Sequence, residues 1–214
     1  MATPSGPPRL APRDVCDHLA AGAILVDCRD PRAFGAGHVA GSLNVWVDGP
    51  QFPERVSWFV PSGATLILLA ETDGDVPGAI AGLTRVGLRD VAGYLTGASA
   101  VHETGLPAGT LTNVTPADLA RRLPREPELV VLDVREPAEW AEGHVTGARH
   151  IPMRQVAARL AELPRDRRIA ITCAGGVRSS LVGSMLLANG FTDLLNLWGG
   201  MTAWVQSGLP TVRD

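Results

Sequence analysis

The feature that most constrains this chain is an internal repeat. The segment VDCRDP at 26–31 reappears as LDVREP at 132–137, 106 residues further on. The glycine–histidine segment that follows, at 37–41, reappears at 143–147 with the same offset. A repeat of this length indicates a duplicated domain, because the units of solenoid proteins are far shorter.

The ends of the two copies set the expected domain boundaries. A Gly-Leu-Pro segment closes the first copy at 105–107 and returns at 208–210, now 103 residues on. We therefore expect one domain at 10–108 and a second at 109–214. The proline-rich residues 1–9 are expected to form a disordered tail.

Within each copy, short apolar segments alternate with segments of helical spacing. Each copy is expected to begin with a short helix near Ala11 or Thr115, followed by an apolar strand at 23–26 or 129–132 and by a turn or helix. A second apolar strand and a helix, which covers 155–163 in the second copy, come next. A strand and loop followed by a helix, and a final strand at 91–95 or 194–197, complete the copy. This alternation predicts an α/β protein, with two small, mostly parallel sheets that carry helices on both faces. Ligands of such sheets bind at the carboxyl ends of the strands.

One strand end carries the residues with the clearest chemistry. The β-rich segment 169–172 leads into Cys173 to Ser179 (CAGGVRS), and a helical pattern follows. Gly175 and Gly176 allow backbone conformations in which successive amides point inward and form an anion-binding cup. The helix start and Arg178 add positive charge, which favours a thiolate at Cys173. The alternative is a buried cysteine before an ordinary glycine turn, but the offsets favour a reactive thiol.

Composition and charge exclude several other classes of function. The net charge is −3 with no basic block, so binding of nucleic acid or of a membrane surface is not expected. No apolar run reaches the roughly 18 residues of a membrane span, and no signal-peptide pattern is visible. The three cysteines, Cys16, Cys28 and Cys173, form no CxxC pair, which argues against disulfides and structural zinc. We expect a cytoplasmic protein without metal or cofactor.

Several motifs in order resemble a rhodanese domain. Residues 132–152 closely resemble its first half, Cys173 to Ser179 resembles its active loop C-x-x-G-x-R-S, and Trp198 to Trp204 resembles its closing glycine–glycine–tryptophan segment. The resemblance covers residues 112–210, and the first copy resembles the same domain. A finer resemblance, carried by 52–61, is to the two rhodanese domains that follow a metallo-β-lactamase-like domain in some bacterial fusions. The HxHxDH pattern of such hydrolases does not occur here.

The resemblance implies a thiosulfate sulfurtransferase. Cys173 would take the outer sulfur of a small anionic donor such as thiosulfate, and the resulting persulfide would pass it to a thiol or protein-cysteine acceptor. Arg178 would attract the donor, while the loop would hold the transferred sulfur through its remaining residues, Ala174, Gly175, Gly176, Val177 and Ser179.

Two alternatives stay open. Cysteine phosphatases and arsenate reductases of this fold resemble C-x5-R, whereas only four residues separate Cys173 from Arg178, a shorter loop that favours sulfur over phosphate. A non-catalytic interaction module with the same fold is the second alternative.

The first copy lacks the reactive residues. The 103-residue offset places Ala70 opposite Cys173 and Asp75 opposite Arg178, and Glu71 and Asp73 add further negative charge. Carboxylates in place of an anion cup would repel an anionic donor. We therefore predict that the first domain is catalytically inactive.

The inactive copy also shows which residues belong to the shared scaffold. Asp133, Arg135 and His144 recur there as Asp27, Arg29 and His38, so we interpret all of them as structural. We expect Cys28 to be a buried thiol. Trp204 and the equivalent pair Trp140 and Phe34 are expected in the core.

Overall fold

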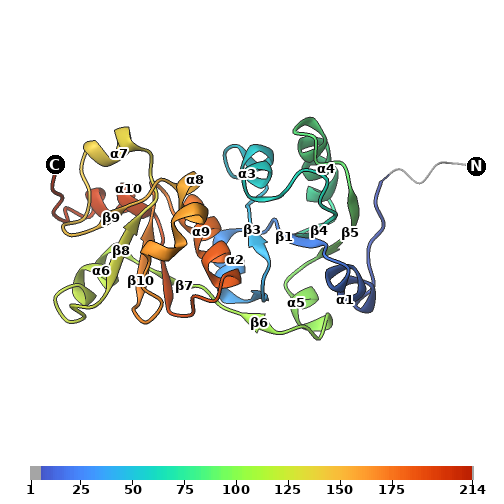
Figure 1. Cartoon of the computed structure of the whole chain (residues 1–214), viewed down its shortest axis with the longest axis horizontal. Coiled ribbons are helices and arrows are strands. Elements are labelled where there is room, and N and C mark those ends of the chain that lie inside the picture. Colours follow the sequence, from blue (N-terminus) through green and yellow to red (C-terminus); the bar gives the residue numbers. More distant parts are fainter. Residues whose placement is uncertain (1–5, 214) are drawn as a thin grey trace, which may run out of the picture. The chain divides into compact units, whose positions relative to one another are not determined.

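The computed structural model describes residues 6–213, which form two compact units, 1–110 and 111–214 when the chain ends are included (Figure 1). The boundary between the units thus lies after residue 110, two residues beyond the expected boundary after residue 108. Ala108 and Gly109 form strand β6 (Ala108–Gly109), which pairs antiparallel with β2 (His38–Val39) of the first copy. These two residues stay with the first unit because their backbone hydrogen bonds are made there.

The first unit is built on a four-stranded parallel sheet. Its strand order is β3 (Leu43–Asn44), β1 (Ile24–Asp27), β4 (Leu66–Ala70), β5 (Val91–Thr96). The helices are α1 (Pro12–Ala20), α2 (Pro31–Ala36), α3 (Phe52–Phe59), α4 (Asp75–Arg85) and α5 (Ser99–Glu103). Alternate residues of a strand face opposite sides, so Ile67 and Leu69 pack with Val15 of α1 and Val101 of α5 on one face. Helix α4 packs on β4 and against α3.

The expectation of a disordered tail at 1–9 is wrong for its last residues. Residues 1–5 lie outside the described residues. Pro8 and Arg9, in contrast, lie along the edge strand β5: the Tyr94 amide donates to the Pro8 carbonyl at 3.0 Å, and Arg9 forms an isolated parallel bridge with Tyr94. The edge strand offers unpaired backbone groups, and the segment that enters the domain satisfies them.

The second unit repeats the plan with a five-stranded parallel sheet. Its strand order is β7 (Thr112–Val114), β11 (Leu194–Leu197), β10 (Ile169–Thr172), β8 (Val130–Asp133), β9 (Arg149–His150). The helices are α6 (Pro116–Arg122), α7 (Pro137–Ala141), α8 (Met153–Val156), the 3-10 helix η1 (Ala157–Glu162), α9 (Val177–Ala188) and α10 (Gly200–Gln206). The α/β class with helix-covered parallel sheets is confirmed.

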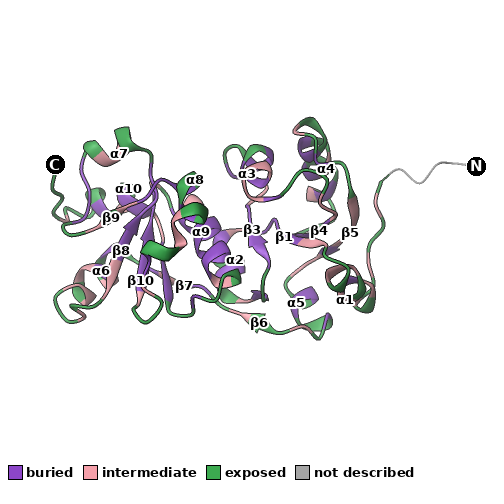
Figure 2. Ribbon diagram, in the orientation of Figure 1, coloured by how far each residue is buried: buried purple, intermediate pink, exposed green. Residues whose placement is uncertain are grey.

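Burial explains the apolar strand sequences of the second unit. All four residues of β10 and of β11 are buried, as Figure 2 shows for the interior of each sheet. On one face, Ala170 packs with Leu119 of α6 and Trp204 of α10. On the other face, the side chain of Ile171 lies beside Gly183 of α9. A strand covered on both faces has no need of polar alternation.

Of three local expectations for the second unit, the structure confirms one and corrects two. Thr115 caps α6 as expected, with a reciprocal capping box to Asp118. The strand expected after 129–132 is β9. It is not apolar but has the sequence Arg149–His150, because it lies at the sheet edge. The helix expected at 155–163 is instead a short α-helix followed by a 3-10 helix, with non-helical backbone angles at Arg159.

Candidate functional site

Cys173 follows directly after the buried strand β10, at the carboxyl edge of the second sheet. The next three residues form the turn, in which Ala174 is half-buried and Gly175 exposed, and Val177 begins α9. Gly176 has φ +98°, a left-handed conformation that favours glycine. This conformation reverses the chain between the strand end and the helix start, which the two glycines predicted.

The Cys173 sulfur is enclosed by its own loop. Cys173 is 1% exposed. The Gly176 amide donates to Sγ at 3.1 Å, and Oγ of the fully buried Ser179 lies 3.4 Å from the same sulfur. These are hydrogen-bonding groups fixed in place before any reaction, so they can stabilise negative charge on sulfur at this position.

The start of α10 holds the loop from behind. The Met201 amide donates to the Cys173 carbonyl at 2.8 Å, and the Thr202 amide donates to the Ala174 carbonyl at 3.0 Å. Gly200, at φ +55°, lies against the same two carbonyls, where a Cβ atom would overlap them. This contact was not predicted from the sequence, although the paired glycines at 199 and 200 were a visible signal of close backbone approach.

A second support comes from the neighbouring strand β11. Asn196, which is fully buried, donates from Nδ2 to the Gly176 carbonyl at 3.2 Å. This residue was also missed from the sequence, because a single asparagine in an apolar strand carries no pattern that points to a loop 20 residues away.

Arg178 lies near Cys173, as expected, but its guanidinium is already engaged. It donates to both carboxylate oxygens of Glu139 in α7, through Nη1 at 2.7 Å and Nη2 at 2.6 Å. The hydrogen bonds from Arg178 hold the pKa of Glu139 below its ordinary value, and Glu139 in turn raises the pKa of Arg178. The sequence reading quoted Glu139 as part of a motif but did not foresee this pair.

The Asp–Arg pairs of the two copies have the same structural role, as predicted. Arg135 forks onto Asp133, which is fully buried, and donates to the Gly143 carbonyl at 2.8 Å. Arg29 makes the same bonds to Asp27 and to the Gly37 carbonyl. Each pair ties the end of a strand to the loop that follows it.

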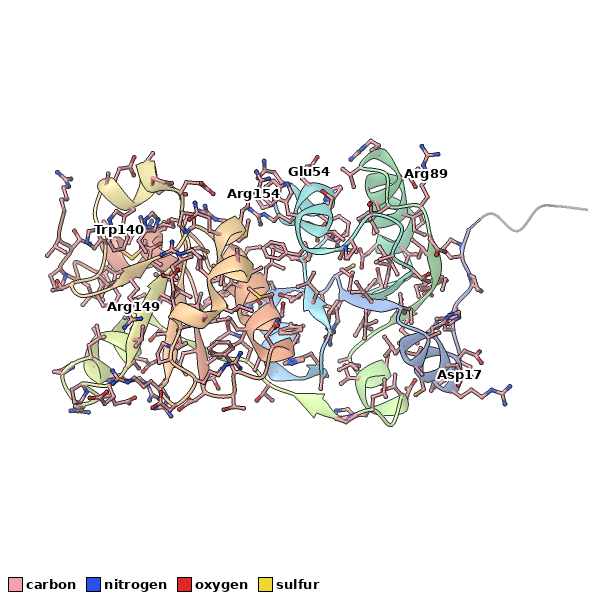
Figure 3. All side chains as sticks on the ribbon, in the orientation of Figure 1. Asp17, Glu54, Arg89, Trp140, Arg149 and Arg154 are labelled. Carbon is pink, nitrogen blue, oxygen red and sulfur yellow. The ribbon has the colours of Figure 1, made fainter. Side chains whose placement is uncertain are left out.

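The histidines also serve the scaffold. The His38 ring stacks on Phe34 with 3.9 Å between centroids, and His144 stacks on Trp140 at 3.4 Å. Trp140, labelled in Figure 3, also stacks on His150. Phe34 and Trp204 are core residues as expected, but Trp140 is only half-buried.

A cavity of about 440 Å³ borders the loop of the second unit. Ala174 forms part of its wall together with two carboxylates, Glu139 and Glu142, and two apolar side chains, Met201 and Val205. Val205 is 58% exposed, which is unusual for a large apolar residue of this protein. The cavity therefore combines an acidic wall with an apolar wall, directly beside the residue that follows Cys173.

The equivalent place in the first unit has a different loop. Asp27 pairs with Leu69 in the register in which Asp133 pairs with Thr172, so Ala70 takes the place of Cys173. Gly74, the last residue before α4, has φ −66° instead of the left-handed conformation of Gly176. The two loops therefore differ in backbone conformation as well as in side chains.

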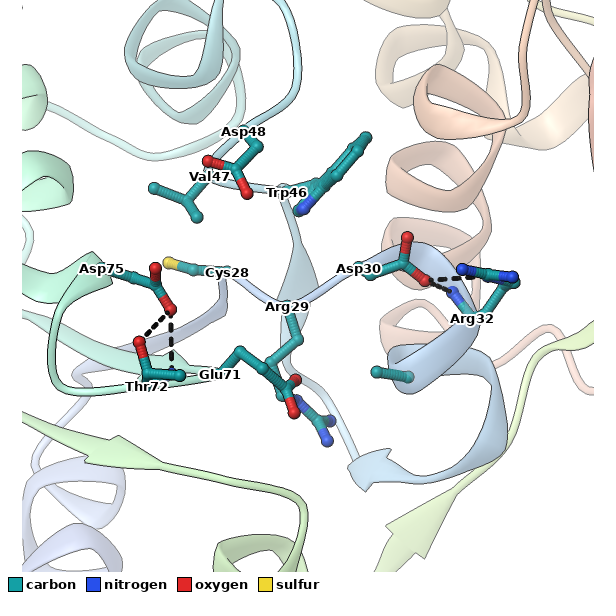
Figure 4. A pocket seen from close by; sticks show the side chains of 11 residues that line it. Cys28, Arg29, Asp30, Arg32, Trp46, Val47, Asp48, Glu71, Thr72 and Asp75 are labelled. Carbon is teal, nitrogen blue, oxygen red and sulfur yellow. Dashed lines mark hydrogen bonds and ion pairs between the residues drawn. The ribbon is translucent and has the colours of Figure 1, made fainter.

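A larger cavity, of about 710 Å³, lies over this loop of the first unit (Figure 4). Its walls include Asp30, Asp48, Glu71 and Asp75. Asp75 turns back and accepts hydrogen bonds from the amide and hydroxyl of Thr72 at 2.8 and 2.9 Å. Where the second unit has an arginine and the Gly176 amide directed at the sulfur, the first has carboxylates and a loop capped by Asp75.

Cys28 also lines this cavity but is 1% exposed, as expected for a buried thiol. Burial raises the pKa of this thiol well above its ordinary value, and the charges of Asp27 and Asp75 raise it further. The raised pKa works against a thiolate at Cys28.

Among residues 6–213, no three His, Cys, Asp or Glu side chains gather closely enough to hold a metal ion. Within the same residues, no helix has the length and apolar character needed to cross a membrane.

Several known proteins are similar to one half of this chain. A sulfurtransferase from Allochromatium vinosum is 38% identical over 94 residues, which are 44% of this chain and 88% of that protein. The thiosulfate sulfurtransferase GlpE from Pseudomonas putida is 33% identical over 89 residues, 42% of this chain and 81% of GlpE. The probable adenylyltransferase/sulfurtransferase MoeZ from Mycobacterium tuberculosis is 36% identical over 101 residues, which are 46% of this chain but only 26% of that longer protein.

Among solved structures, a rhodanese-like domain protein from Staphylococcus aureus aligns with 34% identity and a TM-score of 0.45, covering 49% of this chain and 99% of that protein. The family model of the rhodanese-like domain matches twice, at residues 11–104 and 115–207. These two matches cover most of the chain, one in each compact unit, and the protein therefore belongs to the rhodanese-like domain family and contains that domain in tandem.

Proposed function

We propose that this protein is a sulfurtransferase that carries sulfane sulfur as a persulfide on Cys173 of its second domain. The observation that carries the proposal is the contact between the Gly176 amide and Cys173 Sγ at 3.1 Å. A fixed donor at this distance would stabilise both the attacking thiolate and the persulfide. The sulfurtransferases among the relatives support the same reaction class.

The reaction would run in two displacements. The Cys173 thiolate attacks the outer sulfur of the donor, and the S–S bond of the donor breaks. With thiosulfate as the donor, sulfite leaves with the bonding electrons and Cys173 holds a persulfide. An acceptor thiolate, or cyanide in a test, then attacks the terminal sulfur and releases the Cys173 thiolate. No external oxidant or reductant is needed, and one difficult transfer becomes two easier ones.

Each loop residue has a role in this scheme. The Gly176 amide and the Ser179 hydroxyl contact the sulfur, and Ala174, Gly175 and Val177 complete the loop that would hold the transferred sulfur. Arg178 supplies positive charge beside Cys173. Because a thiolate must persist between turnovers, a reducing compartment such as the cytoplasm suits this chemistry.

We propose that the first domain takes no part in sulfur transfer. It has Ala70 where the nucleophile would be, and the lining of the adjoining cavity has four carboxylates against two arginines. An anionic sulfur donor would be repelled there.

The test is the mass of the intact protein after incubation with thiosulfate. We expect a gain of about 32 Da, one sulfur atom held covalently, which cyanide removes as thiocyanate. The gain should be lost in Cys173→Ser and kept in Cys16→Ser, a control in the other domain. An unchanged wild-type mass would favour a non-catalytic module, and Cys173-dependent release of phosphate from an aryl phosphate would favour a phosphatase.

A further inference from the structure

The guanidinium of Arg178 is paired with a carboxylate of its own domain. Glu139 accepts one hydrogen bond from each terminal nitrogen, which uses two of the five N–H donors and balances the positive charge. The side chains are 16% and 31% exposed, which shields the pair from water more than an ordinary surface pair. Glu139 also accepts from the Glu136 amide at 3.0 Å, which fixes the carboxylate in this position.

This occupation bears on the choice of sulfur donor. The three oxygens of thiosulfate are suited to a free arginine fork, which binds oxyanions through two parallel hydrogen bonds. Here such a donor would compete with Glu139 for the terminal nitrogens and would meet its negative charge. The pair therefore disfavours binding of a doubly charged oxyanion to Arg178, the residue that was expected to attract it.

The cavity beside the loop adds a second observation. Its lining includes the carboxylates of Glu139 and Glu142 and the apolar side chains of Met201 and Val205, while its arginine, Arg135, is bound to Asp133. Apolar side chains next to carboxylates suit the carbon skeleton and amino group of an organic molecule. The two carboxylates disfavour a small dianion there.

The first domain separates this pair from the shared scaffold. The residue at the position of Glu139 is Ala33, and Asp75 stands at the position of Arg178. Scaffold residues such as the Asp–Arg pairs are present in both copies, whereas both members of the Glu139–Arg178 pair are absent from the copy without a nucleophile. The pair thus belongs to the reactive site and not to the fold.

We propose that Glu139 is a specificity-determining residue that competes with oxyanions for Arg178 and biases Cys173 towards organic persulfides. The inference rests on the proposed sulfur transfer at Cys173. In the favoured first step, the Cys173 thiolate attacks the terminal sulfur of R–S–S–H, the S–S bond breaks, and R–S⁻ leaves with the bonding electrons. The proton stays on the new persulfide or passes to water, and no redox partner is required.

The test compares two donors on single variants. The rate of Cys173 persulfide formation is measured by intact mass with thiosulfate and with cysteine persulfide, for wild type, Glu139→Gln and Glu139→Asp. Glutamine removes the charge and places one donor group against the guanidinium, which frees Arg178. We expect Glu139→Gln to raise the thiosulfate rate at least about fivefold, the scale of a lost charge-assisted hydrogen bond, and to change the persulfide rate less than about twofold. Glu139→Asp keeps the charge and should stay selective like the wild type.

The matched control is Glu162→Gln. Glu162 forms a similar two-pronged pair with Arg159, with both bonds at 2.7 Å, but on η1 and outside the loop. This variant should leave both rates unchanged. A general loss of structure in Glu139→Gln would lower both rates and cannot produce a selective gain for thiosulfate.

The outcomes separate the two proposals. If wild-type protein gains sulfur at Cys173 but Glu139→Gln shows an equal or lower thiosulfate rate, Glu139 only positions Arg178 and the inference is overturned. If neither donor adds sulfur to Cys173 in any form of the protein, the proposed function itself fails.

Discussion

At the scale of single residues, the sulfur of Cys173 is surrounded by few groups, and each is fixed. Its hydrogen-bonding neighbours are the Gly176 amide and the Ser179 hydroxyl. The amide cannot be removed by a side-chain substitution, but the hydroxyl can. Ser179 is therefore the residue at which the contribution of this environment is measured most directly.

We predict that Ser179→Ala slows Cys173 persulfide formation from thiosulfate about tenfold, the scale of one hydrogen bond to a charged group. The measurement is the rate of mass gain under single-turnover conditions. Ser184→Ala is the matched control, since Ser184 is also a buried serine of α9 but donates to the Leu181 carbonyl. Equal rates for the two variants would show that the Ser179 hydroxyl does not act on the sulfur.

At the scale of elements, the reactive loop is held between two helices. Helix α9 begins within the loop, and the first amides of α10 bind the carbonyls of Cys173 and Ala174. Both contacts depend on glycines in left-handed conformations, Gly176 and Gly200. The position of Cys173 is thus set by backbone contacts between residues 28 positions apart in the chain.

We predict that Gly200→Ala displaces the loop and lowers the rate of persulfide formation at least about tenfold, because the sulfur would move away from its fixed donors. The added Cβ would overlap the Cys173 and Ala174 carbonyls. Gly208→Ala is the control: Gly208 has a similar φ, +69°, but nothing lies within 4 Å of the added atom. Both variants share the cost of a non-glycine residue at positive φ, so only displacement of the loop distinguishes their rates. Similar rates in the two would disprove the role given to α10.

At the scale of the whole molecule, one fold occurs twice with different loops. Both units keep the Asp–Arg pair, the stacked histidine and the buried parallel strands. They differ at the carboxyl edge of the sheet, where the first has Ala70, a self-capped Asp75 and a right-handed Gly74.

We predict that restoring two side chains does not activate the first domain. The variant Ala70→Cys with Asp75→Arg, in a Cys173→Ser background, should form no detectable thiocyanate from thiosulfate and cyanide. Glu71 and Asp73 would remain, and the loop would lack the left-handed glycine that directs an amide to the sulfur. Thiocyanate above the level of the Cys173→Ser parent would contradict this.

The sequence by itself determined the duplication, the α/β class, the reactive loop and the scaffold residues. These are properties of local pattern: strand and helix periodicity, paired glycines at a strand end, and the presence or absence of a residue in two copies of one domain. The inactive copy acted as an internal control, which is why Asp133, Arg135 and His144 were read correctly as structural residues.

Only the tertiary structure decided which groups meet at the site. Glu139 and Arg178 are 39 residues apart in the chain, and Asn196 lies 20 residues from the carbonyl that it supports. Such contacts depend on how strands are ordered in the sheet and how helices enter their loops, and no local pattern encodes that order. The loop at Cys173 could be predicted from the sequence because its functional groups lie in seven consecutive residues. The carboxylate that occupies its arginine was not, because that contact exists only after α7 and α9 have folded onto the same sheet edge.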